Sequence, residues 1–289
     1  MNAMCSLKEI LLCGEEWKQH DTVTIFADLL RHGVRIRLPE QAGFCLTDLS
    51  GTKAENVLAA VTDRKTADAA LAAGVAVLGV ELTDQALGGC RYVIQGVEDI
   101  TYEYCRRVFR RAHCLPWEMG RTGRCLIREL CLADLDDLYD LYESVYDSDG
   151  FGKNVEPLFE RDKEEEYQRQ YLENMYALWG YGMWLVWDAD RKHLIGRAGL
   201  ERKVINGENI LEIGYLIAPK YRRLGYAYEV CQWILEFAAE HCPGEKLNAF
   251  IEKDNRASLS LIRKLGFHWE NQEILQGKAM ERYVKSLLF

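Results

Sequence analysis

Two short apolar runs constrain most strongly what the first part of this 289-residue chain can fold into. Residues 57–61 and 75–80 are continuously apolar and rich in β-branched side chains, which is typical of parallel strands covered on both faces. Between them, residues 67–73 predict a helix that Gly74 ends. Because strands that alternate with helices build right-handed βαβ units, the pattern predicts a parallel, Rossmann-like α/β sheet.

The α/β pattern ends near the middle of the chain. Over residues 115–124 the periodicity stops, and Gly120 and Gly123 supply turn residues. A length of 289 residues agrees with two domains of roughly 100–200 residues each. We therefore expect an accessory α/β domain over 1–118, a linker over 119–124 and a second domain over 125–289.

Composition and charge exclude several function classes. A net charge of -9 and a pI near 5.3 argue against a protein that binds nucleic acid by covering its phosphates. No run approaches the roughly 18 apolar residues of a membrane span, and the N-terminus has no basic segment followed by an apolar one, so a cytoplasmic protein without membrane contact is expected. The ten cysteines include no pair at the two-residue spacing of zinc sites, so no metal is expected.

The second domain carries several strand signals. Residues 125–130, 183–187 and 194–200 predict strands. Asn206-Gly207 is a strong hairpin signal before a further strand over 210–217.

Directly after this last strand comes a basic, glycine-bearing loop over 218–227, followed by an amphipathic helix. Free backbone N–H groups and the positive end of the helix dipole bind a pyrophosphate when small residues let the ligand approach. Gly225 and Ala227 are small residues at this place. Alone, the segment is more typical of a simple strand-to-helix turn.

A second motif follows. Asn255 and Ser258 open another helix, which closes with Lys264-Leu265-Gly266-Phe267. Together the two motifs resemble the GNAT superfamily of acetyl-coenzyme A-dependent N-acetyltransferases, and the resemblance covers Cys125 to the C-terminus. The matching residues are Arg222, Gly225, Ala227, Asn255, Ser258, Gly266 and Phe267.

The resemblance implies an α+β domain with a mixed, splayed central sheet that binds acetyl-CoA as co-substrate. Backbone amides from about Arg223 to Ala227 would bind the pyrophosphate, the end of the preceding strand would pair with the pantetheine, and Asn255 would contact the coenzyme arm near the sulfur. The implied coenzyme-binding residues are Leu216, Ile217, Arg222, Arg223, Leu224, Gly225, Tyr226, Ala227, Asn255 and Ser258.

Transfer of an acetyl group to an amine by direct attack needs a base, an oxyanion donor and an acid. Glu212 is a candidate base, although it is equally typical of a solvated or salt-bridged strand carboxylate, and Glu201 on the preceding strand is the second choice. A common form of the family places a tyrosine acid seven residues after the Asn, where this chain has Ile262. The departure is familiar in the branch resembling ribosomal-protein acetyltransferases, where Ser258 would be the acid.

The resemblance implies that the acceptor is a primary amine of a small molecule or a peptide. Acidic residues accumulate between residues 147 and 166, which suits a cationic amine, but a solvated helix start is the alternative. Aromatic residues over 176–184 either line an acceptor pocket or fill the core. A monomer or a homodimer is expected.

The first domain weakly resembles a degenerate haloacid dehalogenase-like fold over about fifty residues around Asp63. The Asp-x-Asp pair that this phosphatase chemistry needs is missing after an early strand, and Asp48 is a lone candidate. Two alternatives to a transferase therefore remain: an acetyl-CoA-binding sensor with a catalytically weak site, and a phosphatase in the first domain.

Overall fold

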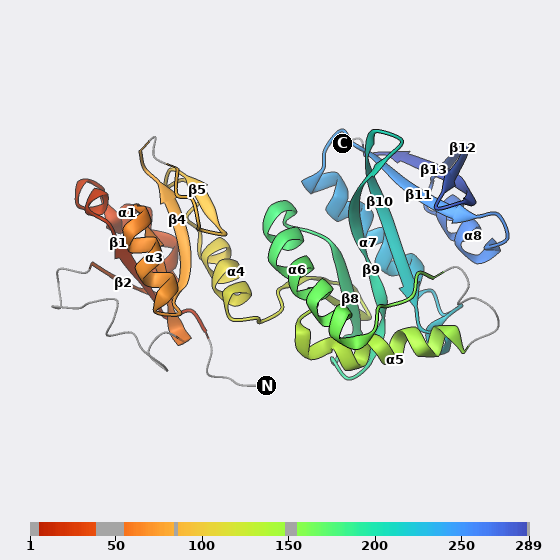
Figure 1. The fold of residues 1–289 in the computed structure, drawn as a ribbon, viewed down its shortest axis with the longest axis horizontal. Helices are drawn as coiled ribbons and strands as arrows, with labels where there is room; N and C mark the ends of the chain where they lie inside the picture. Colours follow the sequence, from red (N-terminus) through yellow and green to blue (C-terminus); the bar gives the residue numbers. More distant parts are fainter. Residues whose placement is uncertain (1–5, 39–54, 84–85, 148–154, 288–289) are drawn as a thin grey trace. The chain divides into compact units, whose positions relative to one another are not determined.

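The computed structural model describes residues 6–38, 55–83, 86–147 and 155–287 (Figure 1). The chain divides into two compact units, Met1–Trp117 and Glu118–Phe289.

The first unit is an α/β domain around a five-stranded sheet of order β2-β1-β3-β4-β5, in which every neighbouring pair is parallel. All five residues of β1 and of β3 are buried, which confirms the parallel sheet predicted from the apolar runs. The strand order reverses between β1 and β3, as in doubly wound sheets. The elements are β1 (Glu9–Cys13), α1 (Thr22–Ile25), α2 (Ala27–Arg31), β2 (Arg35–Arg37), β3 (Val57–Val61), α3 (Arg64–Ala72), β4 (Ala76–Glu81), β5 (Val93–Gln95) and α4 (Tyr102–Ala112).

The second unit is built on a mixed eight-stranded sheet of order β12-β13-β11-β10-β9-β8-β7-β6. Only β10 and β11 pair in parallel, and the other neighbours are antiparallel. The elements are β6 (Glu118–Arg121), β7 (Cys125–Arg128), α5 (Leu135–Tyr146), α6 (Arg161–Trp179), β8 (Met183–Asp188), β9 (Leu194–Ile205), β10 (Glu208–Ile217), α7 (Tyr226–His241), β11 (Lys246–Glu252), α8 (Arg256–Lys264), β12 (His268–Leu275) and β13 (Lys278–Ser286).

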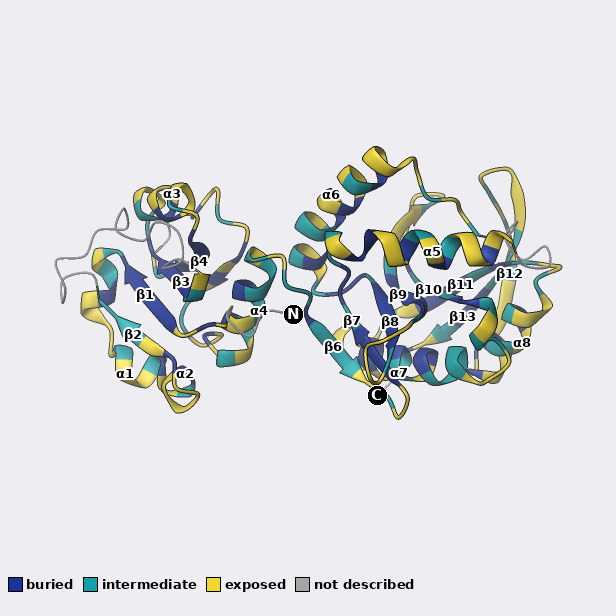
Figure 2. Cartoon of the chain, turned by 90° about the horizontal axis from the view of Figure 1, so that it is seen from below, coloured by how far each residue is buried: buried dark blue, intermediate teal, exposed yellow. Residues whose placement is uncertain are grey.

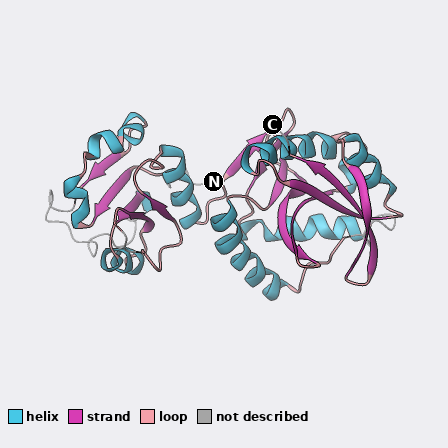
Figure 3. Cartoon of the chain, turned by 90° about the horizontal axis from the view of Figure 1, so that it is seen from above, coloured by secondary structure: helices cyan, strands magenta, loops and turns pink. Residues whose placement is uncertain are grey.

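Helices cover both faces of this sheet. Figure 2 shows α5 and α6 along one face and α7 and α8 along the other, with the buried strands between them, and Figure 3 shows the same layers by secondary structure. The main core lies under α7 and includes Trp184, Ile213, Ile234 and Phe237. Against α5, a smaller core includes Leu138 and Leu185.

Two details differ from or refine the sequence prediction. Residues 118–121, most of which were expected in a linker, form β6 and pair with β7, because their backbone groups complete the open edge of the sheet. The predicted hairpin is present: Asn206 and Gly207 have φ of 50° and 83°, as a two-residue type I′ turn requires, and they join β9 to β10.

Candidate functional site

The candidate site begins where the two central parallel strands separate. β10 and β11 are paired at Leu211 with Leu247 and at Glu212 with Asn248, and the pairing ends there. Asn248 is buried, and its side-chain amide donates to the Leu211 carbonyl at 3.1 Å. The backbone of Leu216 and Ile217 therefore lies in the part of β10 that pairs with β9 but not with β11.

After β10, the chain forms a loop suited to binding an anion. Arg223 and Gly225 both have positive φ, 61° and 84°. Gly225 is the N-cap residue of α7, and no described side chain caps this helix end. The first N–H groups of a helix have no partner within the helix, so those of the first turn of α7 are donors for an anion. A Cβ on Gly225 would lie 3.4 Å from Arg124 Nη2 in a strained conformation, which explains the glycine.

Arg222 lies in this loop, but its side chain folds back on the strand. Its Nε donates to the Ile217 carbonyl at 3.0 Å. The charged group therefore holds the start of the loop against the end of β10. Arg222 was expected among the coenzyme contacts, and this geometry adds a role in shaping the loop.

Arg124 braces the same loop and was missed by the sequence analysis. Its Nη1 donates to the Leu224 carbonyl at 3.0 Å, and its guanidinium lies 4.2 Å from the centroid of the Tyr226 ring. Glu229, in the first turn of α7, holds Arg124 in an ion pair of 2.6 Å. Because the partners are about 100 residues apart in the chain, no local pattern indicates this contact.

The second motif lies across the opening from β10. Asn255 caps α8, its Oδ1 accepting from the Ser258 N–H at 3.2 Å. The Tyr215 hydroxyl donates to the Ser258 carbonyl at 3.4 Å and so bridges β10 and α8. Burial raises the pKa of Tyr215 above its ordinary value, which keeps the phenol protonated at neutral pH. Ile262 is fully buried one turn further along α8.

The two candidate carboxylates lie side by side. Glu201 and Glu212 are direct partners across β9 and β10, so their side chains share a face of the sheet. Lys203 joins them, with its Nζ 2.9 Å from an oxygen of each. Burial raises the pKa of Glu212 above its ordinary value, although the Lys203 charge opposes this shift.

This carboxylate pair faces α6. Burial raises the pKa of Tyr167, and the charge of Glu201 contributes in the same direction, which places Glu201 near this helix. Met183 packs over Gly214, which lies on β10 between Glu212 and the end of the strand. A Cβ added at Gly214 would lie 3.2 Å from the Sδ and Cε atoms of Met183.

The aromatic residues over 176–184 mostly belong to the core. Tyr176 and Trp184 are 1% and 0% exposed. The Tyr176 hydroxyl donates to the Met183 carbonyl at 2.6 Å, and Trp184 packs edge-on against Phe237. These two side chains therefore fill the core rather than an acceptor pocket.

Two of the acidic residues within α6, Glu164 and Glu165, have partners of their own. Glu164 is buried and accepts from the Phe159 N–H and from Gln168. Glu165 is ion-paired with Arg169 at 2.8 Å, which favours a solvated helix face at this residue. Asp149 lies outside the described residues.

The first unit offers no comparable site in its described part. β1 is followed by Gly14 and Glu15 rather than by an aspartate pair. Asp63 caps α3 and accepts from the Thr66 N–H at 2.9 Å. Asp48 lies outside the described residues.

Two features are absent from the described residues, a membrane-spanning helix and a metal-binding cluster. No helix among them is both long and apolar enough to cross a membrane. Nor do they hold a group of three or more His, Cys, Asp and Glu side chains placed to bind a metal ion.

Residues 124–268, half of the chain, match the family model described as acetyltransferase (GNAT) domain. The chain belongs to the GNAT acetyltransferase family. In this GNAT domain the splayed strands, the loop before α7 and the Asn255 cap all lie in the matched region.

Curated relatives share part of the GNAT domain. YkkB of Bacillus subtilis (strain 168) is 29% identical over 92 residues, which are 31% of this chain and 54% of that protein. The N-acetyltransferase YjdG of the same organism is 29% identical over 102 residues, 35% of this chain and 60% of YjdG. The chain thus spans little more than half the length of these relatives.

Solved structures are similar to the GNAT domain at low sequence identity. The acetyltransferase of Agrobacterium tumefaciens str. C58 is 19% identical, with a TM-score of 0.46 over 57% of this chain and 92% of that one. RimL, a ribosomal L7/L12 alpha-N-protein acetyltransferase, is 14% identical, with a TM-score of 0.49 over 60% of this chain and 95% of that one.

Proposed function

We propose that this protein is an acetyl-CoA-dependent N-acetyltransferase that acetylates the primary amine of a small molecule or a peptide. One observation carries the proposal: the opening between β10 and β11 leads directly to an uncapped helix start in a GNAT domain. Acetyl-CoA has an elongated amide chain that is attached to a pyrophosphate. Binding such a ligand requires a strand edge without a partner and a set of free N–H groups.

Acetyl-CoA, when bound, supplies an activated acetyl group and a thiolate leaving group. The backbone of Leu216 and Ile217 would hold its pantetheine arm, and the amides from Arg223 to Ala227 would hold its pyrophosphate. The positive φ at Arg223 and Gly225 supports this assignment, because alternating left-handed residues turn successive N–H groups toward one anion.

Glu212 is our proposed base. Burial moves the pKa of this carboxyl group toward neutral pH. Proton transfer from an ammonium to Glu212 is therefore more favourable than proton transfer to an exposed glutamate. The charge of Lys203 favours the ionised carboxylate, and Glu201 beside it is the alternative base.

Two residues compete for the role of acid. Ser258 is the residue expected from the family motif. The Tyr215 hydroxyl lies against the same turn of α8 and has the chemistry of the tyrosine acid that Ile262 replaces. We propose Tyr215 as the proton donor and Ser258 as its support.

We also propose which branch of the family the protein belongs to and which type of amine it accepts. The replacement of the usual tyrosine by Ile262 favours the branch that acts on protein N-termini, and the acidity before α6 favours a cationic amine.

Coenzyme binding tests the proposal directly. Acetyl-CoA should raise the melting temperature of the full chain, since a ligand that binds the folded state stabilises it by mass action. Leu224→Glu should remove most of this shift because it places a negative charge in the loop, whereas Leu224→Lys should retain it. Leu224 is 57% exposed, so both variants should fold. Equal shifts in the two variants would count against a pyrophosphate at this loop.

Thiol release separates an enzyme from a sensor. With acetyl-CoA and a panel of amines and peptides, an enzyme releases CoA above the hydrolysis background. Binding without release for any acceptor would favour the sensor, for which the replaced tyrosine acid at Ile262 is the supporting observation.

A further inference from the structure

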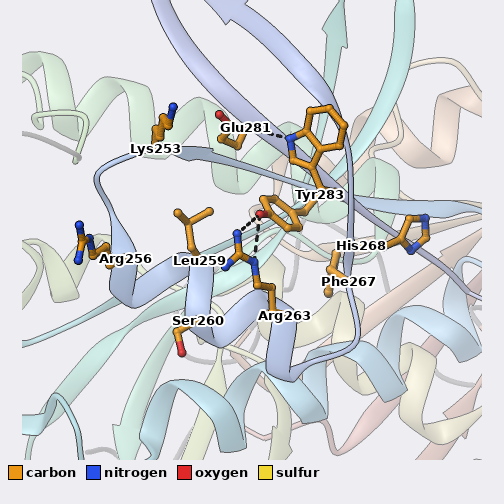
Figure 4. A pocket seen from close by; sticks show the side chains of 10 residues that line it. Lys253, Arg256, Leu259, Ser260, Arg263, Phe267, His268, Glu281 and Tyr283 are labelled. Atoms are coloured by element: carbon orange, nitrogen blue, oxygen red, sulfur yellow. Dashed lines mark hydrogen bonds between the residues drawn. The ribbon is translucent and has the colours of Figure 1, made fainter.

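A cavity lies away from the opening between β10 and β11. It has a volume of about 850 Å³ and is formed by α8, the start of β12 and the facing part of β13. Figure 4 shows Lys253 and Arg256 at one end, His268 at the other, and Leu259 and Tyr283 between them. The volume lies within the range of roughly 300–1,000 Å³ that small-molecule sites occupy.

This cavity is separated from the coenzyme region by the body of α8. Arg256, Ser260 and Arg263 recur at helical spacing and line the cavity. On other sides of the helix, the Ser258 carbonyl meets Tyr215 of β10, and Lys264 Nζ lies 4.1 Å from the ring centroid of Tyr228 in α7. A ligand in the cavity would thus occupy a different surface from the opening beside β10.

Three cations line the cavity without a carboxylate partner among the described residues: Lys253, Arg256 and Arg263. Arg263 donates from Nε and Nη2 to the Tyr283 hydroxyl, at 3.1 and 2.6 Å, and not to a carboxylate. The chain as a whole is acidic, with a net charge of -9. A local group of unpaired cations in an acidic protein is a site for an anion.

The carboxylate of Glu281 and the indole of Trp269, which both line the cavity, are hydrogen-bonded to each other. Glu281 accepts from Trp269 Nε1 at 2.5 Å and from Gln272 Nε2 at 3.2 Å. The Trp269 side chain is fixed at one edge, yet the residue is 55% exposed. An indole that is held in place and still accessible is a stacking surface for a planar ring.

We infer that this cavity is a second binding site, for a mononucleotide. The unpaired cations Lys253, Arg256 and Arg263 bind its phosphate, and Trp269 stacks with its base. Leu259 and Tyr283 supply the apolar floor beneath the sugar and ring. The site belongs to α8, β12 and β13 and does not depend on the activity proposed for the opening beside β10.

Isothermal titration calorimetry on the full chain tests this inference. The protein is first saturated with CoA, so that AMP is excluded from the coenzyme region, and AMP is then titrated. We expect AMP to bind, and adenosine and inorganic phosphate to bind at least about tenfold more weakly, because each probe contacts only one half of the site.

Charge reversal identifies the residues. Lys253→Glu/Arg256→Glu should weaken AMP binding by about tenfold or more, and Trp269→Ala should weaken AMP but not phosphate. The matched control Lys163→Glu/Lys192→Glu changes the net charge equally at exposed residues outside the cavity and should leave AMP affinity unchanged. Melting temperatures and CoA affinity of all variants should stay near those of the wild type.

Three results would overturn the inference. The first is no AMP binding to the CoA-saturated protein, which means that AMP has no site outside the coenzyme region. The second is equal loss of affinity in the cavity variant and the control variant. The third is phosphate binding as tightly as AMP, which means that the planar ring is not recognised.

Discussion

Arg124 and Glu229 are ion-paired although 105 residues separate them in the sequence, with Arg124 Nε 2.7 Å from Glu229 Oε2. The backbone N–H of Arg124 also donates to Glu229 Oε1 at 2.9 Å. Although partial burial opposes it, hydrogen bonds from Thr122 and Arg124 hold the pKa of Glu229 below its usual range. The segment that enters β7 is thereby tied to the first turn of α7, beside the loop proposed to bind pyrophosphate.

Removing this brace should weaken coenzyme binding. We expect Arg124→Ala to raise the Kd for acetyl-CoA by about tenfold, because Leu224 and Tyr226 lose the contacts that hold the loop in place. Arg169→Ala is the control, since it removes an arginine ion-paired with Glu165 on α6. Calorimetric titration measures both. A similar Kd in the two variants would show that the loop keeps its shape without Arg124.

Glu212→Gln should lower kcat/KM by about 100-fold or more, the usual size of a lost general base. A base acts only when deprotonated, so wild-type activity should fall as the pH drops through the pKa of Glu212. Because burial raises this pKa, the acidic limb should lie at a higher pH than the value of about 4.3 for a free glutamate. In Glu212→Gln this limb should be absent from the pH profile.

Glu201→Gln is the matched comparison, since Glu201 shares Lys203 with Glu212. If Glu212 is the base, Glu201→Gln should shift the acidic limb but retain it. Loss of the limb in Glu201→Gln and its persistence in Glu212→Gln would assign the base to Glu201.

Local patterns were sufficient for the parts of the fold that local physics determines. Buried parallel strands such as Val57–Val61 have a continuous apolar sequence, and the turn at Asn206 and Gly207 needs residues that accept positive φ. The residues of the two GNAT motifs also lie where strand, loop and helix meet, because each motif is contiguous in the sequence.

Contacts that depend on tertiary structure were not predictable in this way. Lys203 joins Glu201 and Glu212 only because β9 and β10 pair in one register. Tyr215 meets α8 through the folding of β10 against a helix 43 residues later. The hairpin of β12 and β13, which completes the cavity beside α8, was not predicted, since its exposed residues carry little apolar alternation.

Tyr215→Phe should separate the two candidate acids. If Tyr215 protonates the leaving thiolate, we expect the variant to lose about 100-fold in kcat while its Kd for acetyl-CoA stays within about twofold, because only the hydroxyl is removed. Ser258→Ala should then have the smaller effect on kcat. Stopped-flow release of CoA, with calorimetry for the Kd, measures both. A larger loss in Ser258→Ala would return the role of acid to the serine of the family motif.

Gly14→Ala should destabilise the first unit far more than Gly33→Ala. Both glycines have positive φ, 123° and 76°, so both substitutions carry a backbone cost of at least about 1–2 kcal/mol, and Gly14, whose ψ is 149°, lies in a region that normally only glycine adopts. At Gly33 a Cβ would meet nothing within 4 Å, whereas at Gly14 it would lie 1.7 Å from Thr62 Oγ1. We expect the difference to reach about 2 kcal/mol or more, because Thr62 is buried between β1 and β3.

Hydrogen–deuterium exchange of peptides covering β1 and β3 measures this loss of stability in the full chain. Thr62 Oγ1 donates to the Cys13 carbonyl at 3.3 Å, so displacing Thr62 loosens the ends of both strands and should speed their exchange. In a Thr62→Gly background the clash is gone, so Gly14→Ala should then cost less than it does beside Thr62, and only its backbone cost should remain. If Gly14→Ala speeds exchange equally with and without the Thr62 side chain, its cost comes from the backbone conformation alone.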